Sequence, residues 1–381
     1  MLPGVLLSLL VGPVVAVPAP DLVPLLETVN VTHSDEGKSG FQLVFRLERP
    51  AELPVPDYLP LATLRLKVGM RLILVVTINA IPQVLMDGII INQQLAPGDK
   101  PNTAMLTVTG EDLSCLLALT DVQMPQVETD ALFVTRLLAP FAAYGIVPMV
   151  LPAPTDLPSD PNAGPSHPRG KPLNMIQEKA REHDYVFFIY PGPVPGMNVA
   201  YYGPRFQVPI PQRALTMNMG AATNVTNLSF QHDGNAPSIV MGLVKDTSMY
   251  ASTPALPVIG IPFDVLPLAV LPSTFGNAPY ITTKFLEPNN APNWARAQRQ
   301  AISEANASAR RAVTASGEVD GAKYGMVLYA RALVGVRGAG YSFDGLYYVK
   351  SVSHSIKRGE YKQSFSLQRE GLGSTLPVVP P

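Results

Sequence analysis

The sequence predicts a mainly β protein that contains one small α+β module. Two patterns carry this prediction: apolar and polar residues alternate over long stretches, and one hairpin pattern occurs twice. Phe41–Leu47 shows the alternation, since successive side chains of a strand point to opposite faces. The chain also holds 40 prolines and only 15% charged residues. That composition favours extended structure buried against neighbours over charge-driven disorder.

The clearest hairpin lies at Tyr341–Gly373. Its first strand, Leu346–Ile356, is rich in β-branched and aromatic residues, which favour a pleated sheet. The apolar residues of this strand change face midway, which predicts a β-bulge near Lys350–Ser351. After a polar turn, the second strand alternates from Tyr361 to Gln368. The hairpin holds no reactive constellation, so we expect it to be a scaffold.

The same hairpin pattern recurs at Met86–Asp112. The segment Met86–Ile91 aligns with Phe343–Tyr348, and each contains an Asp-Gly pair. Because such a pair tolerates the positive φ of a tight turn, we expect a structural turn before each strand. These repeat turns would be formed by Asp87, Gly88, Asp344 and Gly345. Two copies at similar spacing predict a duplication within the chain.

The order of these patterns divides the chain into a β unit at 1–112, an α+β module at 113–203, a second β unit at 204–252 and 318–373, a proline-rich insertion at 253–317, and a tail at 374–381. In the module, Asp112 or Ser114 is expected to cap a short helix, and a longer helix begins at Thr129 and ends at Gly145. In the insertion, Asn293 is expected to cap a helix at 293–315 that has a narrow face of small residues.

Composition argues against several classes of protein. The net charge is -1 and no run of Lys and Arg exceeds two, so a nucleic-acid footprint is absent. A single cysteine, Cys115, excludes an intrachain disulfide and a cysteine-based zinc site, and we expect it to be a buried, inert thiol. Prolines interrupt the apolar stretch Leu256–Leu271, so no stable membrane insertion is expected. Leu2–Ala19 is apolar but lacks a preceding basic residue, which favours a buried strand over a signal peptide.

No catalytic, cofactor-binding or metal-binding residue is expected, and the chain is not predicted to be an enzyme. The histidines share no ligand spacing; they are His33, His167, His183, His232 and His354. His354 is expected to be a hydrogen-bonded histidine of the sheet. The charged segment Arg181–Asp184 is expected to be a solvated helix end.

Three stretches together resemble the baseplate hub of contractile phage tails and extracellular contractile injection systems, the phage late-control or tail-hub family. They are Gly40–Phe45 after VPAPDLVPLLETVNVTHS, the run from Met175 through EHDYVFFIYPGPVPGMNVAYYGP, and the closing FDGLYYVKSVSHSIKRGEYKQSFSLQREGLGS. The resemblance spans nearly the whole chain. It implies two tube-like β-barrel domains in one chain, a small inserted α+β domain, and a helical, proline-rich insertion.

The resemblance also implies a function and partners. Such a hub is a homotrimer whose six barrels match a hexameric inner tube and attach it to a trimeric spike. The implied partners are further copies of the chain, the inner tube protein, a separate spike protein and other baseplate proteins. Assembly in the producer cytoplasm, followed by incorporation into a phage tail or tail-like particle, is expected.

Two other readings of the sequence remain open. A secreted β-rich adhesin or capsid-like structural protein would require cleavage of the apolar N-terminus. A cell-wall hydrolase associated with a baseplate would require paired carboxylates in a cleft, which the sequence does not locate.

Overall fold

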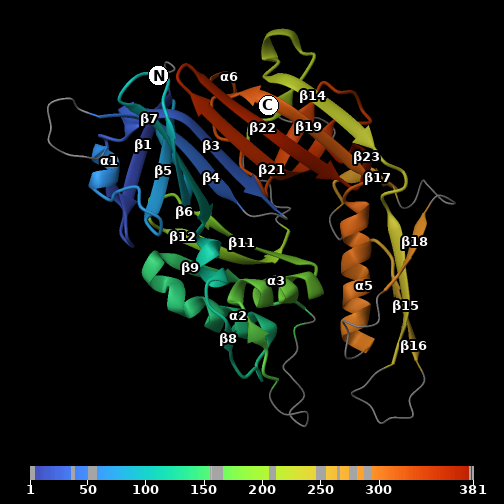
Figure 1. Cartoon of the computed structure of the whole chain (residues 1–381). Helices are drawn as coiled ribbons and strands as arrows, with labels where there is room; N and C mark the ends of the chain where they lie inside the picture. Colours follow the sequence, from blue (N-terminus) through green and yellow to red (C-terminus); the bar gives the residue numbers. More distant parts are fainter. Residues whose placement is uncertain are drawn as a thin grey trace.

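The computed structural model describes residues 5–35, 39–49, 58–154, 156, 166–205, 212–245, 255–263, 267–273, 281–286, 294–376 and 379. Two curled β units share one continuous sheet, a module of helices and strands lies beside the first, and an elongated arm extends from the second (Figure 1). None of the helices in these ranges is long and apolar enough to cross a membrane.

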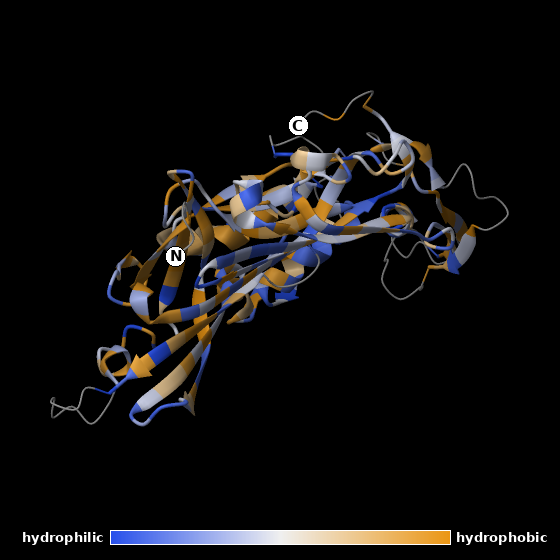
Figure 2. Ribbon diagram, turned by 90° about the horizontal axis from the view of Figure 1, so that it is seen from above, coloured by the Kyte–Doolittle hydropathy of each residue, from blue (hydrophilic) through white to orange (hydrophobic). Residues whose placement is uncertain are grey.

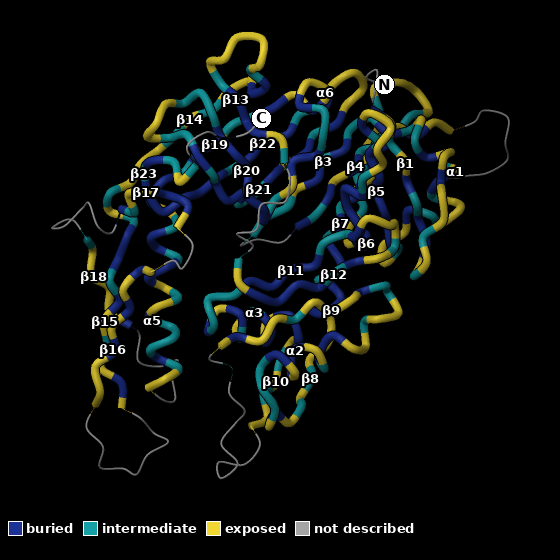
Figure 3. Tube along the Cα trace, turned by 180° about the vertical axis from the view of Figure 1, so that it is seen from behind, coloured by how far each residue is buried: buried dark blue, intermediate teal, exposed yellow. Residues whose placement is uncertain are grey.

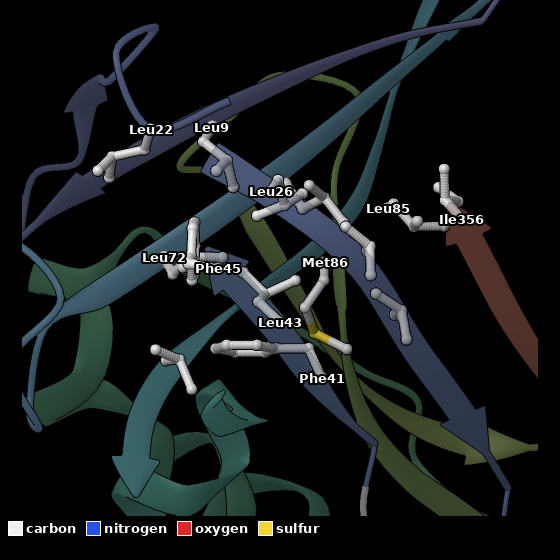
Figure 4. Packing of buried hydrophobic residues seen from close by; sticks show 14 of the residues in the cluster. Leu9, Leu22, Leu26, Phe41, Leu43, Phe45, Leu72, Leu85, Met86 and Ile356 are labelled. Atoms are coloured by element: carbon white, nitrogen blue, oxygen red, sulfur yellow. The ribbon is translucent and has the colours of Figure 1, made fainter. Parts of the chain in front are cut away.

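The first β unit, called the first barrel here, consists of β1 (Val5–Gly12), β2 (Val17–Pro18), β3 (Leu26–Ser34), β4 (Gly40–Glu48), β5 (Arg71–Ile78), β6 (Ile81–Pro97) and β7 (Thr103–Asp112), with the short helices η1 (Val23–Leu25) and α1 (Leu59–Ala62). The expected alternation on β4 is confirmed, because Phe41, Leu43 and Phe45 are buried together in the core (Figure 4). Figure 2 shows the same alternation of hydropathy along the strands.

The second barrel consists of β13 (Leu215–Thr216), η4 (Gly220–Ala222), β14 (Val225–His232), β19 (Val313–Asp320), α6 (Gly321–Tyr324), β20 (Leu333–Arg337), β21 (Gly345–Lys357) and β22 (Glu360–Arg369). Its strands lie in the order β14-β19-β22-β21-β20, and those of the first barrel lie in the order β3-β4-β7-β6-β5. If these five strands of each barrel are numbered in the order in which they follow one another along the chain, both barrels have the spatial order 1-2-5-4-3. The expected duplication is therefore confirmed in the strand topology.

The two barrels are joined where β21 changes its neighbour. Its register on β22 shifts between Val349 and Ser351, which confirms the bulge expected there. Before the bulge β21 pairs with β20, and after it Ser351–Lys357 pair with β3 of the first barrel. A bulge bends and twists a strand, so one strand can serve two barrels.

The module comprises η2 (Leu113–Ala118), β8 (Val122–Gln123), α2 (Asp130–Leu138), η3 (Ala139–Tyr144), β9 (Ile146–Val150), β10 (Arg169–Gly170), α3 (Pro172–Glu182), β11 (Tyr185–Pro191) and β12 (Asn198–Pro204). The expected caps are confirmed: Asp112 accepts from the Ser114 N–H, and Thr129 accepts from the Leu132 N–H. Gly145 ends η3 with a φ of 74°. Strand β9, which pairs with β12 in parallel, was not expected.

The arm differs from the predicted insertion at both ends. It contains β15 (Ser238–Val244), β16 (Leu256–Gly260), β18 (Thr282–Phe285) and α5 (Trp294–Ala309), while β17 (Ala269–Pro272) pairs with β23 (Gly371–Ser374). Strand β15 was assigned to the second barrel, but it pairs with β16 and β18 and packs on α5. The helix ends at Ala309, and Val313 already starts β19 of the barrel, so the predicted boundary at 317 is wrong. The expected cap Asn293 lies outside the described residues.

The alternation of the residues between Lys323 and Arg337 favours a single strand, but the structure divides this segment. Gly321–Tyr324 form a helical turn, and only Leu333–Arg337 pair with β21. Gly325, with a φ of 79°, ends the turn, and β20 begins only at Leu333.

Candidate assembly interface

A buried ion pair fastens the first barrel to the module. The Arg71 guanidinium donates to both carboxylate oxygens of Asp87, at 2.8 and 2.7 Å, and both side chains are almost fully buried. From the module, the Asn198 amide donates to Asp87 at 2.8 Å, and the Gly196 carbonyl accepts from Arg71 at 3.1 Å. The planar guanidinium fits a carboxylate in this two-point geometry, so the contact fixes orientation as well as distance.

The expected Asp-Gly turns hold in one copy and fail in the other. Asp344 precedes β21, its Oδ1 accepts from the Ala339 N–H, and Gly345 has a φ of 130° that favours glycine. Asp87 and Gly88 instead lie inside β6. Gly88 is needed there for space, because an added Cβ would lie 2.2 Å from the Glu111 carbonyl oxygen.

The pairing of the strands corrects the alignment of the two hairpins. Ile90 faces Gly110 just before the bulge of β6, and Val349 faces Leu367 just before the bulge of β21. Ile90 therefore corresponds to Val349. Counting back along each strand, Asp87 corresponds to Leu346 and not to Asp344. The two hairpins are equivalent, but the two Asp-Gly pairs are not.

The junction between the barrels holds two buried histidines beside a cavity. His33 of β3 and His354 of β21 have ring centroids 6.0 Å apart, and both line a cavity of about 340 Å³. His33 Nε2 lies 2.8 Å from the Leu85 carbonyl, and His354 Nδ1 lies 3.0 Å from the Tyr361 hydroxyl. His354 Nε2 has no hydrogen-bond partner among the described residues, so the expectation of a fully hydrogen-bonded histidine holds for one ring nitrogen.

Burial keeps these histidines neutral. It lowers the pKa of His33 to about 4, and the nearby Arg331 acts in the same direction. Burial also lowers the pKa of His354 well below its usual value, with a smaller contribution from His33. Arg331 donates to Ser34 and Ser39 and lies 4.2 Å above the Phe188 ring of the module. The junction thus joins both barrels and the module.

The segment Arg181–Asp184 is not the solvated helix end that was expected. Glu182 is buried and bonded to Arg296 of α5, and Asp184 receives two hydrogen bonds from Arg310, at 2.9 and 2.8 Å. Burial raises the pKa of Glu182, although Lys179 and Arg296 act in the opposite direction. These contacts connect the module to the arm across a polar cavity of about 910 Å³.

Three carboxylates of this cavity are bonded to arginines, Glu178 and Glu182 to Arg296 and Asp184 to Arg310, while Glu304 accepts from the Gln300 amide. His183 belongs to a separate cluster, where its Nε2 lies 2.9 Å from Asp130.

Asp130, Asp156 and His183 bring three potential metal ligands within 4.8 Å of one another. Their ligand atoms are already used: Lys179 lies 2.9 Å from Asp130, and Asp156 accepts from the backbone N–H groups of Asp130 and Ala131. Burial opposes ionisation of Asp130, but the bonds from His183 and Lys179 outweigh it and hold the pKa of this carboxyl below its usual range. The cluster caps α2 and needs no cation to do so.

Exposed strand edges and an apolar face of the arm are candidate contact surfaces within the described residues. On the arm, Met241, Ile259 and Phe285 lie side by side on neighbouring strands, on the face turned away from α5. In the barrels, β14 ends the sheet on one side (Figures 1 and 3). Cys115 is buried, as expected, and His232 lies on β14, where its Nε2 is 3.2 Å from the Ser273 hydroxyl. His167 is exposed.

The sequence did not reveal the residues that connect the barrels, the module and the arm through buried hydrogen bonds and ion pairs. Arg71 and Asp87 are single charged residues at the edge of, or within, otherwise apolar runs, and that placement is a signal of a buried pair. Arg331 and Asp184 carry no such signal. Their partners lie far away in the sequence, so only the fold brings them together.

No protein-family model matches the sequence, and no curated protein matches it in sequence. Solved structures do match. A tail protein from Neisseria meningitidis MC58 has a TM-score of 0.63 at 16% identity, over 97% of this chain and 98% of that one. The 43 kDa tail protein of prophage MuSo2 from Shewanella oneidensis has a TM-score of 0.63 at 12% identity, over 96% and 98%.

A third structure comes from E. coli. This component of the type VI secretion system is described as structurally similar to the T4 bacteriophage tail proteins gp27 and gp5, and it has a TM-score of 0.52 at 11% identity over 93% of this chain and 77% of that one. The two fused β-barrels, the module and the arm together give this chain the fold of these two tail proteins and of the type VI secretion component.

Proposed function

We propose that the chain is a structural baseplate hub that assembles as a homotrimer and joins a hexameric inner tube to a trimeric spike. The duplicated strand order is the observation that carries the proposal. Two equivalent barrels in each of three chains supply six similar units, which is the number a hexameric tube requires. The trimer retains threefold symmetry for the spike, so one ring serves both neighbours.

The internal locks support a mechanical role. The Arg71–Asp87 pair, the Arg331 contacts and Arg310, which follows α5, connect parts that are distant in the sequence. The partners in this proposal are the inner tube protein, a separate trimeric spike protein and other baseplate proteins, and the hub has no catalytic role. It is assembled in the producer cytoplasm and becomes part of a phage tail or tail-like particle.

The mass of the complex in solution tests the proposal. Native mass spectrometry of the chain, alone and with the tube and spike proteins, should give a trimer that binds one spike trimer and one tube hexamer. A chain that stays monomeric with both partners present, or that forms a ring of six chains, contradicts the proposal.

Two further measurements distinguish the hub from the two other functions that the sequence left open, a secreted adhesin and a cell-wall hydrolase. N-terminal sequencing of the mature chain would reveal cleavage if it were a secreted adhesin. A zymogram with cell-wall polymer would show clearing if it were a hydrolase, and we expect neither result.

A further inference from the structure

Among the described residues, one edge of strand β6 in the first barrel has a strand partner along only part of its length, and the equivalent strand of the second barrel shows what the rest of that edge can bind. Each strand carries a bulge, with register shifts between Ile90 and Asn92 in β6 and between Val349 and Ser351 in β21. Before the bulge, β6 pairs with β5 and β21 pairs with β20.

The backbone bonds at the bulge confirm this equivalence. Ile90 accepts from the Gly69 N–H and donates to the Met70 carbonyl. Val349 accepts from the N–H of Arg331 and donates to the carbonyl of Ala332, in the same pattern.

Beyond the bulge the two strands differ in their neighbours. Ser351–Lys357 of β21 pair with β3 of the first barrel. The corresponding segment of β6, Asn92–Pro97, pairs with β7 on one edge, and its other edge has no strand partner among the described residues. Leu95 in this segment is 50% exposed, whereas its equivalent His354 is 1% exposed. In the second barrel, therefore, the equivalent position has a paired strand beside it and a buried side chain.

The strand that would fit this edge is β14, the equivalent of β3. Both begin with a bulge, between Leu26 and Thr28 in β3 and between Val225 and Asn227 in β14. Aligned on these bulges, His33 of β3 corresponds to His232 of β14. Strand β3 has neighbours on both edges, but β14 pairs only with β19 in the part of the chain that the structure describes.

We propose that β14 of one copy pairs antiparallel with Asn92–Pro97 of β6 in the next copy. This inference rests on the proposed trimeric hub and names the contact that builds its ring. The β3–β21 pairing inside one chain would then be repeated between chains. Because the contact joins two different edges, it closes a ring only if the rotation fits, and three chains with six barrel positions complete it. Pairing also covers these two edges, which have no strand partner within the described ranges and would otherwise favour aggregation.

The register follows from the contact within the chain. Val31 faces His354 there, and Thr32 faces Ser353. Between chains Phe230 would therefore face Leu95, and Gln231 would face Gln94. The first pair is apolar and lies on the core side, since Leu95 also faces the buried Leu106. The second pair is polar and lies outside, like Thr32 and Ser353, whose hydroxyl oxygens are 3.0 Å apart.

Cysteine cross-linking tests this register in the full chain. Gln94→Cys combined with Gln231→Cys should give covalent dimers and trimers on mild oxidation, with no larger species if the ring is closed. Thr32→Cys combined with Ser353→Cys is the positive control, because it should link within one chain whatever the assembly. Gln94→Cys combined with Asn227→Cys lies four residues out of register on the same face and should not link. The native Cys115 is buried and stays in every variant.

A second variant pair measures assembly without cross-linking. Leu95→Lys should weaken trimer formation at least tenfold in sedimentation, because it places a charge opposite Phe230. Leu6→Lys on β1 is the matched control, since Leu6 is 51% exposed and lies outside the proposed contact.

The outcomes separate this inference from the function it rests on. A trimer that forms but links only in the out-of-register pair, or that tolerates Leu95→Lys as well as Leu6→Lys, overturns the strand contact and leaves the trimeric hub intact. A chain that does not form a trimer in the presence of its partners overturns both. Links that appear only between this chain and a tube subunit assign the edge to that protein and also overturn the contact.

Discussion

The two barrels have the same strand order, but equivalent positions on their outer faces hold different chemistry. In the first barrel Arg71 pairs with Ile89, and at the equivalent positions of the second barrel Leu333 pairs with Tyr348. The buried ion pair Arg71–Asp87 therefore corresponds to Leu333 and Leu346. The first pair binds Gly196 and Asn198 of the module, while the second packs with Leu268 near the base of the arm.

This difference shows how the same barrel architecture can be joined to two different parts of the chain, the module and the base of the arm. The outer face of the same two strands holds the module in one barrel and residues next to the arm in the other. A buried ion pair fixes direction, since each hydrogen bond needs its geometry, but it contributes little net stability compared with an apolar pair. Apolar packing stabilises through buried area and tolerates adjustment.

The largest loss of stability is expected when the buried ion pair Arg71–Asp87 of the first barrel is broken. Asp87→Leu leaves the Arg71 guanidinium buried without its carboxylate, which should lower the free energy of unfolding by about 3–5 kcal/mol. The double variant Arg71→Leu with Asp87→Leu copies the second barrel and should regain most of that loss. Urea unfolding measures both, and a double variant as unstable as the single one contradicts the comparison.

The junction between the barrels should make stability depend on pH. His33 and His354 are neutral in the folded chain, whereas an unfolded histidine takes up a proton near pH 6.5. The unfolded state therefore binds more protons below pH 6.5, so stability is full above that pH and falls as the pH drops towards about 4. His33 alone should account for up to about 3 kcal/mol of this loss.

The pH dependence is checked by unfolding at several pH values. His33→Gln keeps a donor for the Leu85 carbonyl and should flatten the slope below pH 6.5. His232→Gln is the control on the equivalent strand, outside the junction. An unchanged slope in His33→Gln would contradict the assignment.

The apolar contact of the second barrel, in which Leu333 packs against Leu268, should lose less stability when it is disrupted. Leu333→Ala removes buried side-chain volume beside Leu268 and should cost about 2–3 kcal/mol. Hydrogen exchange should show the loss in β20, β21 and the Leu268 segment while the module stays protected. Equal loosening of the module would show that the two attachments are not independent.

The smallest effect is expected at the contact between the module and the arm. Asp184→Asn weakens the paired hydrogen bonds from Arg310 and should cost about 1–2 kcal/mol, because the site keeps some solvent contact. Limited proteolysis should cut the arm faster while urea unfolding of the barrels changes little. The matched control is Glu360→Gln, a surface partner of Lys362.

The sequence alone determined the local elements. Alternation located β4 and both hairpins, the switch of face in Leu346–Ile356 located the bulge, and the oxygen-bearing side chains of Asp112 and Thr129 located two helix starts. These signals are local, because each depends on residues within a few positions of one another.

Only the tertiary structure decided which strands are neighbours. The alternation of β15 suits any half-buried sheet, so its place in the arm depends on β16, β18 and α5. Asp87-Gly88 and Asp344-Gly345 look alike in the sequence, yet β5 pairs along β6 and keeps Asp87 in a strand. The sequence also could not reveal the edges of β6 and β14 that have no strand partner in the described part of the chain, because an edge is defined by whether the fold brings a partner to it.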